Sequence, residues 1–74
     1  MEPHYHINVF WDDRSGNWVA DVPDLHYCSG HGPTPAEAVA EAQVAIELWL
    51  ETARDEGLPI PEPRYRPAPA SKAA

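Results

Sequence analysis

The stretch from Val22 to Ala42 constrains the fold of this chain most, because a strand end, a Pro-Asp corner, a short extended segment and a helix start follow one another directly. Thr34 is placed to cap the helix, and Pro35 occupies the first helical position, where its missing N–H costs nothing. Glu37 stands where the acid of a capping box reaches back to the N–H of the cap residue. The sequence therefore predicts a helix that begins at Pro35.

This helix is predicted to run from Pro35 to about Glu56, where Gly57 and the following Leu58-Pro59 favour a left-handed stop. One broad apolar face is expected to pack on a sheet, and it consists of Ala38, Val39, Ala42, Ala45, Ile46, Trp49, Leu50 and Ala53. The opposite face is acidic, with Glu37, Glu41, Glu47, Glu51 and Asp55, but it also contains Val44 and Leu48. That apolar pair is either a tolerated exposed contact or the centre of a subunit or partner contact.

Three short strands are expected before the helix. The alternation from His4 to Trp11 predicts a first strand, with Tyr5, Ile7, Val9 and Trp11 facing the core and Phe10 on the outer face. After a turn over residues 12–17, residues 18–22 are expected to return antiparallel as a second strand that Pro23 ends. A third strand around residues 27–31 has small residues at Cys28, Ser29, Gly30 and Gly32, which would let a helix approach closely.

The segment Leu58–Pro63 alternates apolar residues with prolines, which restricts it to a short fourth edge strand or an extended stretch along the sheet edge or another subunit. We therefore expect an α+β fold of the order β-β-β-α-β, with a three-stranded antiparallel sheet and one long helix packed on it. Residues 1–63 form this domain, and residues 64–74 are predicted to be a disordered Pro/Ala-rich tail.

Charge limits the class of partner. The 74 residues carry a net charge of −7, and residues 1–63 hold all twelve acids with only two basic residues, a net charge of −10. A domain with this charge is poorly suited to bind nucleic acid, because Lys and Arg are needed to neutralise the phosphates. It is suited to bind a basic protein. The alternative is that the acidic surface only makes the protein soluble.

The remaining composition predicts a small cytoplasmic protein. The single cysteine excludes an internal disulfide, no apolar run reaches the roughly 20 residues of a membrane span, and no signal peptide opens the chain. A domain near 60 residues buries only about 60% of the surface that its unfolded chain exposes, so a partner or self-association would support the core.

No residue pattern indicates an enzyme, a metal site or a cofactor. The four histidines His4, His6, His26 and His31 lack the spacing of known metal motifs. A Cys28 nucleophile assisted by His26 or His31 is outweighed by the use of a lone cysteine as an apolar filler. We expect Asp12-Asp13 to be ordinary turn residues, and Gly30-His31-Gly32 lacks a full phosphate-binding pattern.

Four motifs in this order resemble the HicB family of small antitoxin-like domains: Trp18–Leu25, Cys28–Gly32, Thr34–Ala38 and Pro59–Pro63. The match spans about residues 5–63. The resemblance implies a three-stranded sheet with a helix across it and a short fourth strand, often assembled as dimers or tetramers. It also implies neutralisation of a small basic HicA-type toxin that cleaves RNA, by covering the active surface of that toxin.

Two departures from the family pattern matter. His26-Tyr27 stands where the family usually has a smaller pair ending in Gly. Many HicB antitoxins continue into a DNA-binding domain, whereas only the predicted tail follows Pro63 here, so no direct specific DNA binding is expected.

We therefore predict a non-enzymatic HicB-like antitoxin that oligomerises and binds a basic HicA-like toxin. An orphan homo-oligomeric module that binds a protein or ligand is the alternative. The residues predicted to contact the partner or a second copy are Glu37, Glu41, Val44, Leu48, Glu51 and Asp55.

Overall fold

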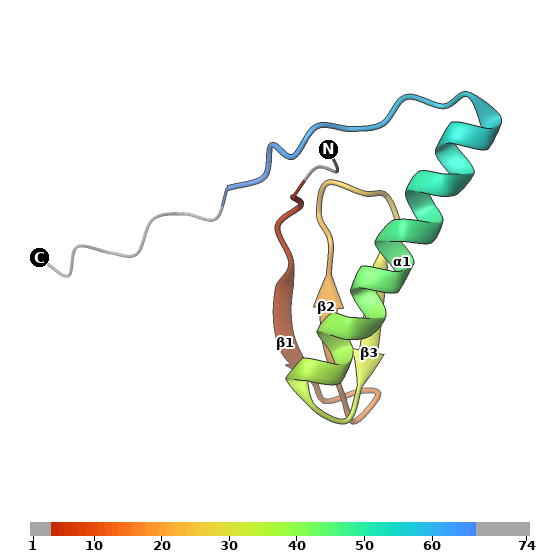
Figure 1. The fold of residues 1–74 in the computed structure, drawn as a ribbon. Coiled ribbons are helices and arrows are strands. Elements are labelled where there is room, and N and C mark those ends of the chain that lie inside the picture. Colours follow the sequence, from red (N-terminus) through yellow and green to blue (C-terminus); the bar gives the residue numbers. More distant parts are fainter. Residues whose placement is uncertain (1–3, 67–74) are drawn as a thin grey trace, which may run out of the picture.

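The computed structural model describes residues 4–66. In this part of the chain, three strands precede one helix: β1 (Asn8–Asp12), β2 (Asn17–Asp21), β3 (Ser29–Gly32) and α1 (Pro35–Glu56). The strands form an antiparallel sheet in the order β1-β2-β3, and α1 crosses one face of it (Figure 1). The predicted α+β fold with a three-stranded antiparallel sheet and one long helix is confirmed.

A hydrogen-bonded turn joins β1 to β2. The Asp12 carboxylate accepts the backbone N–H of Arg14 at 3.2 Å and the hydroxyl of Ser15 at 2.9 Å. Gly16 adopts a φ of 69°, and its N–H donates to the Asp12 carbonyl. These local bonds fix the register in which Trp11 lies opposite Trp18, with the two rings in edge contact at 5.7 Å.

Both ends of α1 follow the predicted capping signals. Thr34 is extended, and its hydroxyl oxygen accepts the N–H of Glu37 at 3.2 Å. At the other end, Gly57 has a φ of 68°, and the N–H of Leu58 donates to the Ala53 carbonyl at 2.8 Å. One detail differs from the expected capping box, because the Glu37 carboxylate accepts from the Thr34 hydroxyl, at 3.4 Å, and not from the Thr34 N–H.

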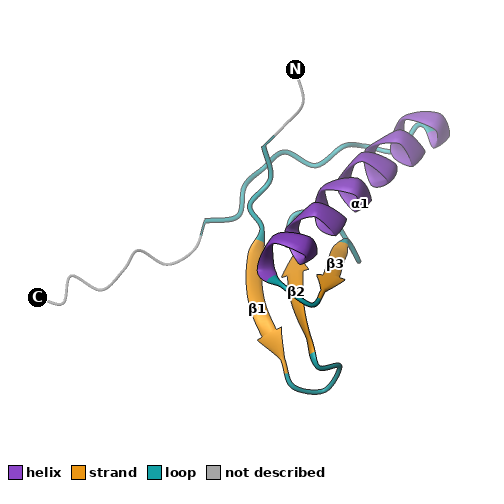
Figure 2. Ribbon diagram, turned by 60° about the horizontal axis from the view of Figure 1, so that its bottom comes forward, coloured by secondary structure: helices purple, strands orange, loops and turns teal. Residues whose placement is uncertain are grey.

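Small residues of β3 bring α1 directly onto the sheet, as predicted. A Cβ atom added to Gly30 would overlap backbone atoms of Ala38 and Ala42, and one added to Gly32 would stand 2.8 Å from the Glu37 Cβ. Figure 2 shows the helix on one side of the sheet, with the other side uncovered in that view. The resulting core cluster contains Ala20, Val22, Leu25, Cys28, Ala38 and Ala42.

The first strand is shorter and less covered than expected. Tyr5 and Ile7 pack against the core but precede β1. Val9 and Trp11 lie opposite Ala20 and Trp18 on the helix side of the sheet, yet they are 39% and 48% exposed. The reason is the placement of α1, which lies mostly over β3 and β2 and contacts β1 least.

The expected fourth edge strand is absent from the described residues, since residues 58–66 have no strand assignment. Pro59, Pro61 and Pro63 have no N–H to donate to a strand ladder. Side chains hold this segment instead: the Tyr5 hydroxyl donates to the Pro61 carbonyl at 2.6 Å. In Figure 1 the segment runs back from the end of α1 toward the chain preceding β1.

The Asp24 carboxylate holds the last described residues. Its Oδ2 atom accepts the backbone N–H groups of Arg64 at 3.1 Å and Tyr65 at 3.0 Å. The centroids of the Tyr65 and His6 rings are also 4.8 Å apart. Residues 67–74 of the predicted tail 64–74 lie outside the described residues, so its disorder stays a prediction.

Candidate functional site

The six residues predicted to contact a partner lie on one exposed stripe of α1. Spacings of three and four residues place them one above another along the helix, and we call them the acidic stripe: Glu37, Glu41, Val44, Leu48, Glu51 and Asp55. All six are exposed, with Val44 and Leu48 at 55% and 59%. The structure therefore brings together an apolar pair with two carboxylates at each end. Its role in binding stays a prediction.

Glu37 differs from the other carboxylates of the acidic stripe, because it also belongs to the helix cap. Its backbone N–H and its carboxylate both contact the Thr34 hydroxyl. Of the four acids, it is the one with a side-chain hydrogen bond among the described residues. Glu41, Glu51 and Asp55 are the better placed to meet a partner.

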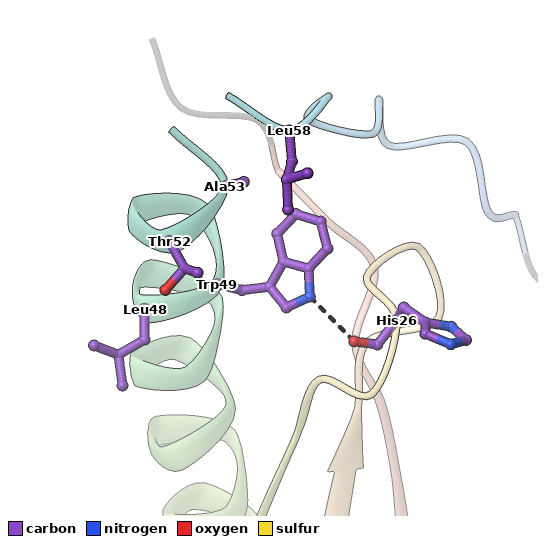
Figure 3. A pocket seen from close by; sticks show the side chains of 6 residues that line it. All are labelled: His26, Leu48, Trp49, Thr52, Ala53 and Leu58. Carbon is purple, nitrogen blue, oxygen red and sulfur yellow. Dashed lines mark hydrogen bonds between the residues drawn. The ribbon is translucent and has the colours of Figure 1, made fainter. Parts of the chain in front are cut away.

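A cavity beside the acidic stripe was not predicted from the sequence. It has a volume of about 470 Å³, and we call it the Trp49 groove after its central ring; it is lined by His26, Leu48, Trp49, Thr52, Ala53 and Leu58. The Trp49 indole N–H donates to the His26 carbonyl at 3.1 Å. Figure 3 shows Trp49 reaching from α1 toward the turn that carries His26, with Leu58 beside the indole ring. Leu48 is common to the groove and the acidic stripe.

The turn next to the groove contains a strained residue. Tyr27 adopts a φ of 57°, in the left-handed region that favours glycine, and its side chain is 93% exposed. The centroids of the Tyr27 and His26 rings are 4.1 Å apart. This backbone conformation gives a physical reason for the Gly that ends the corresponding pair in the resembled family.

Cys28 has the environment of a core residue. Its side chain is 3% exposed, within the cluster that also holds Val22 and Leu25. Burial, and secondarily the charge of Asp21, raise the pKa of the Cys28 thiol above its ordinary value. A raised pKa keeps the thiol protonated near neutral pH, which is the opposite of nucleophile activation.

The histidines do not converge on a metal site in the part of the chain that the structure describes. No group of three or more His, Cys, Asp or Glu side chains there is arranged to hold a metal ion. A ring nitrogen of His6 lies 2.7 Å from the Asn8 side-chain oxygen, whereas His26 borders the Trp49 groove. Within residues 4–66, α1 is also too polar to cross a membrane.

The Trp49 groove was not predictable from the sequence because its walls are far apart along the chain. His26, Trp49 and Leu58 come from a turn, the helix and the segment after it. The available signal was the indole of Trp49, since a partly buried Trp N–H requires an acceptor. Nothing in the local pattern identified the His26 carbonyl as that acceptor.

Comparison with known proteins agrees with the resemblance indicated by the four motifs. The profile of the HicB-like antitoxins of bacterial toxin–antitoxin systems matches residues 5–68. A UPF0150 protein from Synechocystis sp. is 34% identical over 53 residues, which cover 72% of this chain and 73% of that protein. No solved structure is significantly similar. The chain therefore belongs to the HicB-like antitoxin family of bacterial toxin–antitoxin systems.

Proposed function

We propose that this protein is an antitoxin that binds a small basic HicA-type toxin in the cytoplasm and neutralises it by occluding its RNA-cleaving surface. Membership of the HicB-like family supports a toxin–antitoxin role, and occlusion of a toxin surface is achieved by binding alone. The observation that carries the proposal is the acidic stripe: an exposed apolar pair with carboxylates at both ends, on the face of α1 turned away from the sheet.

The chemistry of the acidic stripe fits a toxin that binds RNA. A protein that grips phosphates presents Lys and Arg, so a carboxylate-rich surface competes for the same groups. Opposite charges speed the encounter of two proteins and fix their relative orientation. Val44 and Leu48 add the apolar centre that specific interfaces place inside a polar rim.

Co-expression tests the proposal. The protein is produced together with a HicA-type toxin, or with a small basic protein if the reading frame beside its gene encodes one, and co-purification and growth are measured. We expect the two proteins to co-purify and the growth arrest caused by the toxin to be relieved. If the chain neither co-purifies with such a toxin nor relieves its growth arrest, the proposed function is wrong.

The Val44→Glu, Leu48→Glu double variant tests the surface. Both side chains are exposed, so the fold should persist, whereas two added charges at the centre should lower partner affinity at least tenfold, or about 1.4 kcal/mol. Ala36→Glu, Gln43→Glu is the matched control, because it adds the same charges at exposed positions of α1 that lie neither three nor four residues from any member of the acidic stripe. Isothermal titration calorimetry measures the affinity of both variants for the partner. If the two variants bind the partner equally well, the acidic stripe does not contribute to binding.

A further inference from the structure

The Trp49 groove has the properties of a receptor for an apolar side chain. Leu48 and Leu58 are 59% and 50% exposed, and the Trp49 ring lies between α1 and the turn at His26. Its hydrogen bond to the His26 carbonyl fixes the indole, so one wall of the groove is formed in advance. An apolar centre bordered by polar residues is the arrangement found at the core of protein interfaces.

The electrostatics of α1 indicate which kind of segment would enter. The helix carries six acidic residues and one arginine, Arg54. Asp55 and Glu56 lie in the last turn, where the helix dipole is already negative and acids destabilise the helix. Both are one turn from Thr52 or Ala53 of the groove. Four of the six acids, Glu47, Glu51, Asp55 and Glu56, lie in the half of α1 that lines the groove, against the single Arg54. A cationic segment would therefore meet net negative charge beside the groove.

From these two observations we infer that the Trp49 groove binds a basic segment of the protein partner, with one apolar anchor side chain held between Trp49, Leu58 and Thr52. The inference rests on the proposed function, because it names the part of the partner that is captured and where. Lys and Arg on either side of the anchor meet Glu51, Asp55 and Glu56.

A second copy of this chain is the poorer occupant. Its own helix would bring the same acidic residues to the groove, and like charges across an interface cost several kcal/mol. The basic residues Arg64 and Arg66 follow a segment that Tyr5 and Asp24 hold elsewhere on the molecule. The charge argument therefore favours a different, basic protein.

A peptide titration of the full chain tests the groove without a toxin. The probe is a fluorescein-labelled peptide of Lys, Arg and Ala with one central Phe, and its control has Ala in place of Phe. We expect the Phe peptide to bind about fivefold more tightly, by fluorescence anisotropy at low salt. It should also shift the Trp49 indole N–H resonance, which is recognised by its absence from the spectrum of Trp49→Phe.

Thr52→Phe tests the location, because it fills the groove from an exposed helix position. It should abolish the advantage of the Phe peptide. Ala36→Phe places the same side chain at an exposed position about 24 Å along the helix and should change nothing. Equal binding of the two peptides to the wild type, or full binding by Thr52→Phe, would overturn the inference and leave only nonspecific charge attraction.

Two further measurements separate this inference from the proposed function. Where the wild type co-purifies with the toxin and Thr52→Phe does so equally well, the groove inference fails and the antitoxin function stands. If the wild type binds no toxin, the antitoxin function is wrong. The peptide titration then still shows whether the Trp49 groove binds a basic segment with an apolar anchor. If sedimentation shows that wild-type oligomers dissociate in Thr52→Phe, the occupant is a second copy and the inference is wrong.

Discussion

Tyr27 occupies a backbone conformation that favours glycine. A side chain at a φ of 57° brings its Cβ close to the following carbonyl oxygen, which costs about 1–2 kcal/mol. The 93% exposed ring recovers little of this by burial. Its contact with His26 places an aromatic pair at the border of the Trp49 groove. The strain is therefore retained at a position next to the candidate site.

Tyr27→Gly should stabilise the fold by up to about 1 kcal/mol, because glycine relieves the left-handed strain but loses more chain entropy on folding. Urea unfolding measures the change. Tyr27→Ala is the control, since it removes the same ring and keeps a Cβ at the same φ. Identical stabilities of the two variants would contradict a left-handed Tyr27 in solution.

At the level of elements, the contact between β3 and α1 sets the separation of the sheet and the helix. Gly30 lies against the backbone of the helix itself, so no side-chain rearrangement relieves an added methyl group. The neighbouring residues Ala38 and Ala42 are fully buried and have only a methyl side chain. The helix is therefore positioned by the absence of side chains as much as by their packing.

Gly30→Ala should destabilise the fold by about 3 kcal/mol, the upper range for overpacking, because the helix backbone must move. Gly57→Ala is a matched control: it has a φ of 68° with no atom within 4 Å of an added Cβ, so only the conformational cost of about 1 kcal/mol applies. Thermal unfolding should give a clearly lower Tm for Gly30→Ala. A Tm at or above that of Gly57→Ala would show that α1 sits farther from β3.

The helix was predictable residue by residue because its signals are local. Thr34, Pro35 and Gly57 act on the turn in which they stand, and the observed bounds Pro35–Glu56 match them. The exposure of Val9 and Trp11 was not predictable, since it depends on which strands α1 covers. The alternation of residues predicts that Val9 and Trp11 face the helix side of the sheet. It does not predict how many strands the helix covers.

For the whole molecule, contacts between distant segments complete the fold and the site. The Trp49–His26 bond joins residues 23 positions apart, and Asp24 holds residues about 40 positions later. The acidic stripe was predictable because one helix carries all of it. The Trp49 groove and the Asp24 contacts were not, because no local period relates their members. The corner around Asp24 to Tyr27 thus supports both the groove and the segment after α1.

Asp24→Ala should release the segment around Arg64 and Tyr65 without unfolding the domain. The carboxylate accepts both backbone N–H groups, and such charge-assisted bonds are worth about 1.5–3 kcal/mol when shielded, less at this exposed site. Hydrogen exchange should show faster amide exchange at residues 64 and 65, while the amides of β2 and α1 keep their protection. Asp24→Asn, which retains one acceptor oxygen, should lie between Ala and the wild type, and Asp13→Ala should behave as the wild type. Unchanged exchange at 64 and 65 in Asp24→Ala would mean that the Tyr5 hydroxyl, through the Pro61 carbonyl, is sufficient to hold the segment.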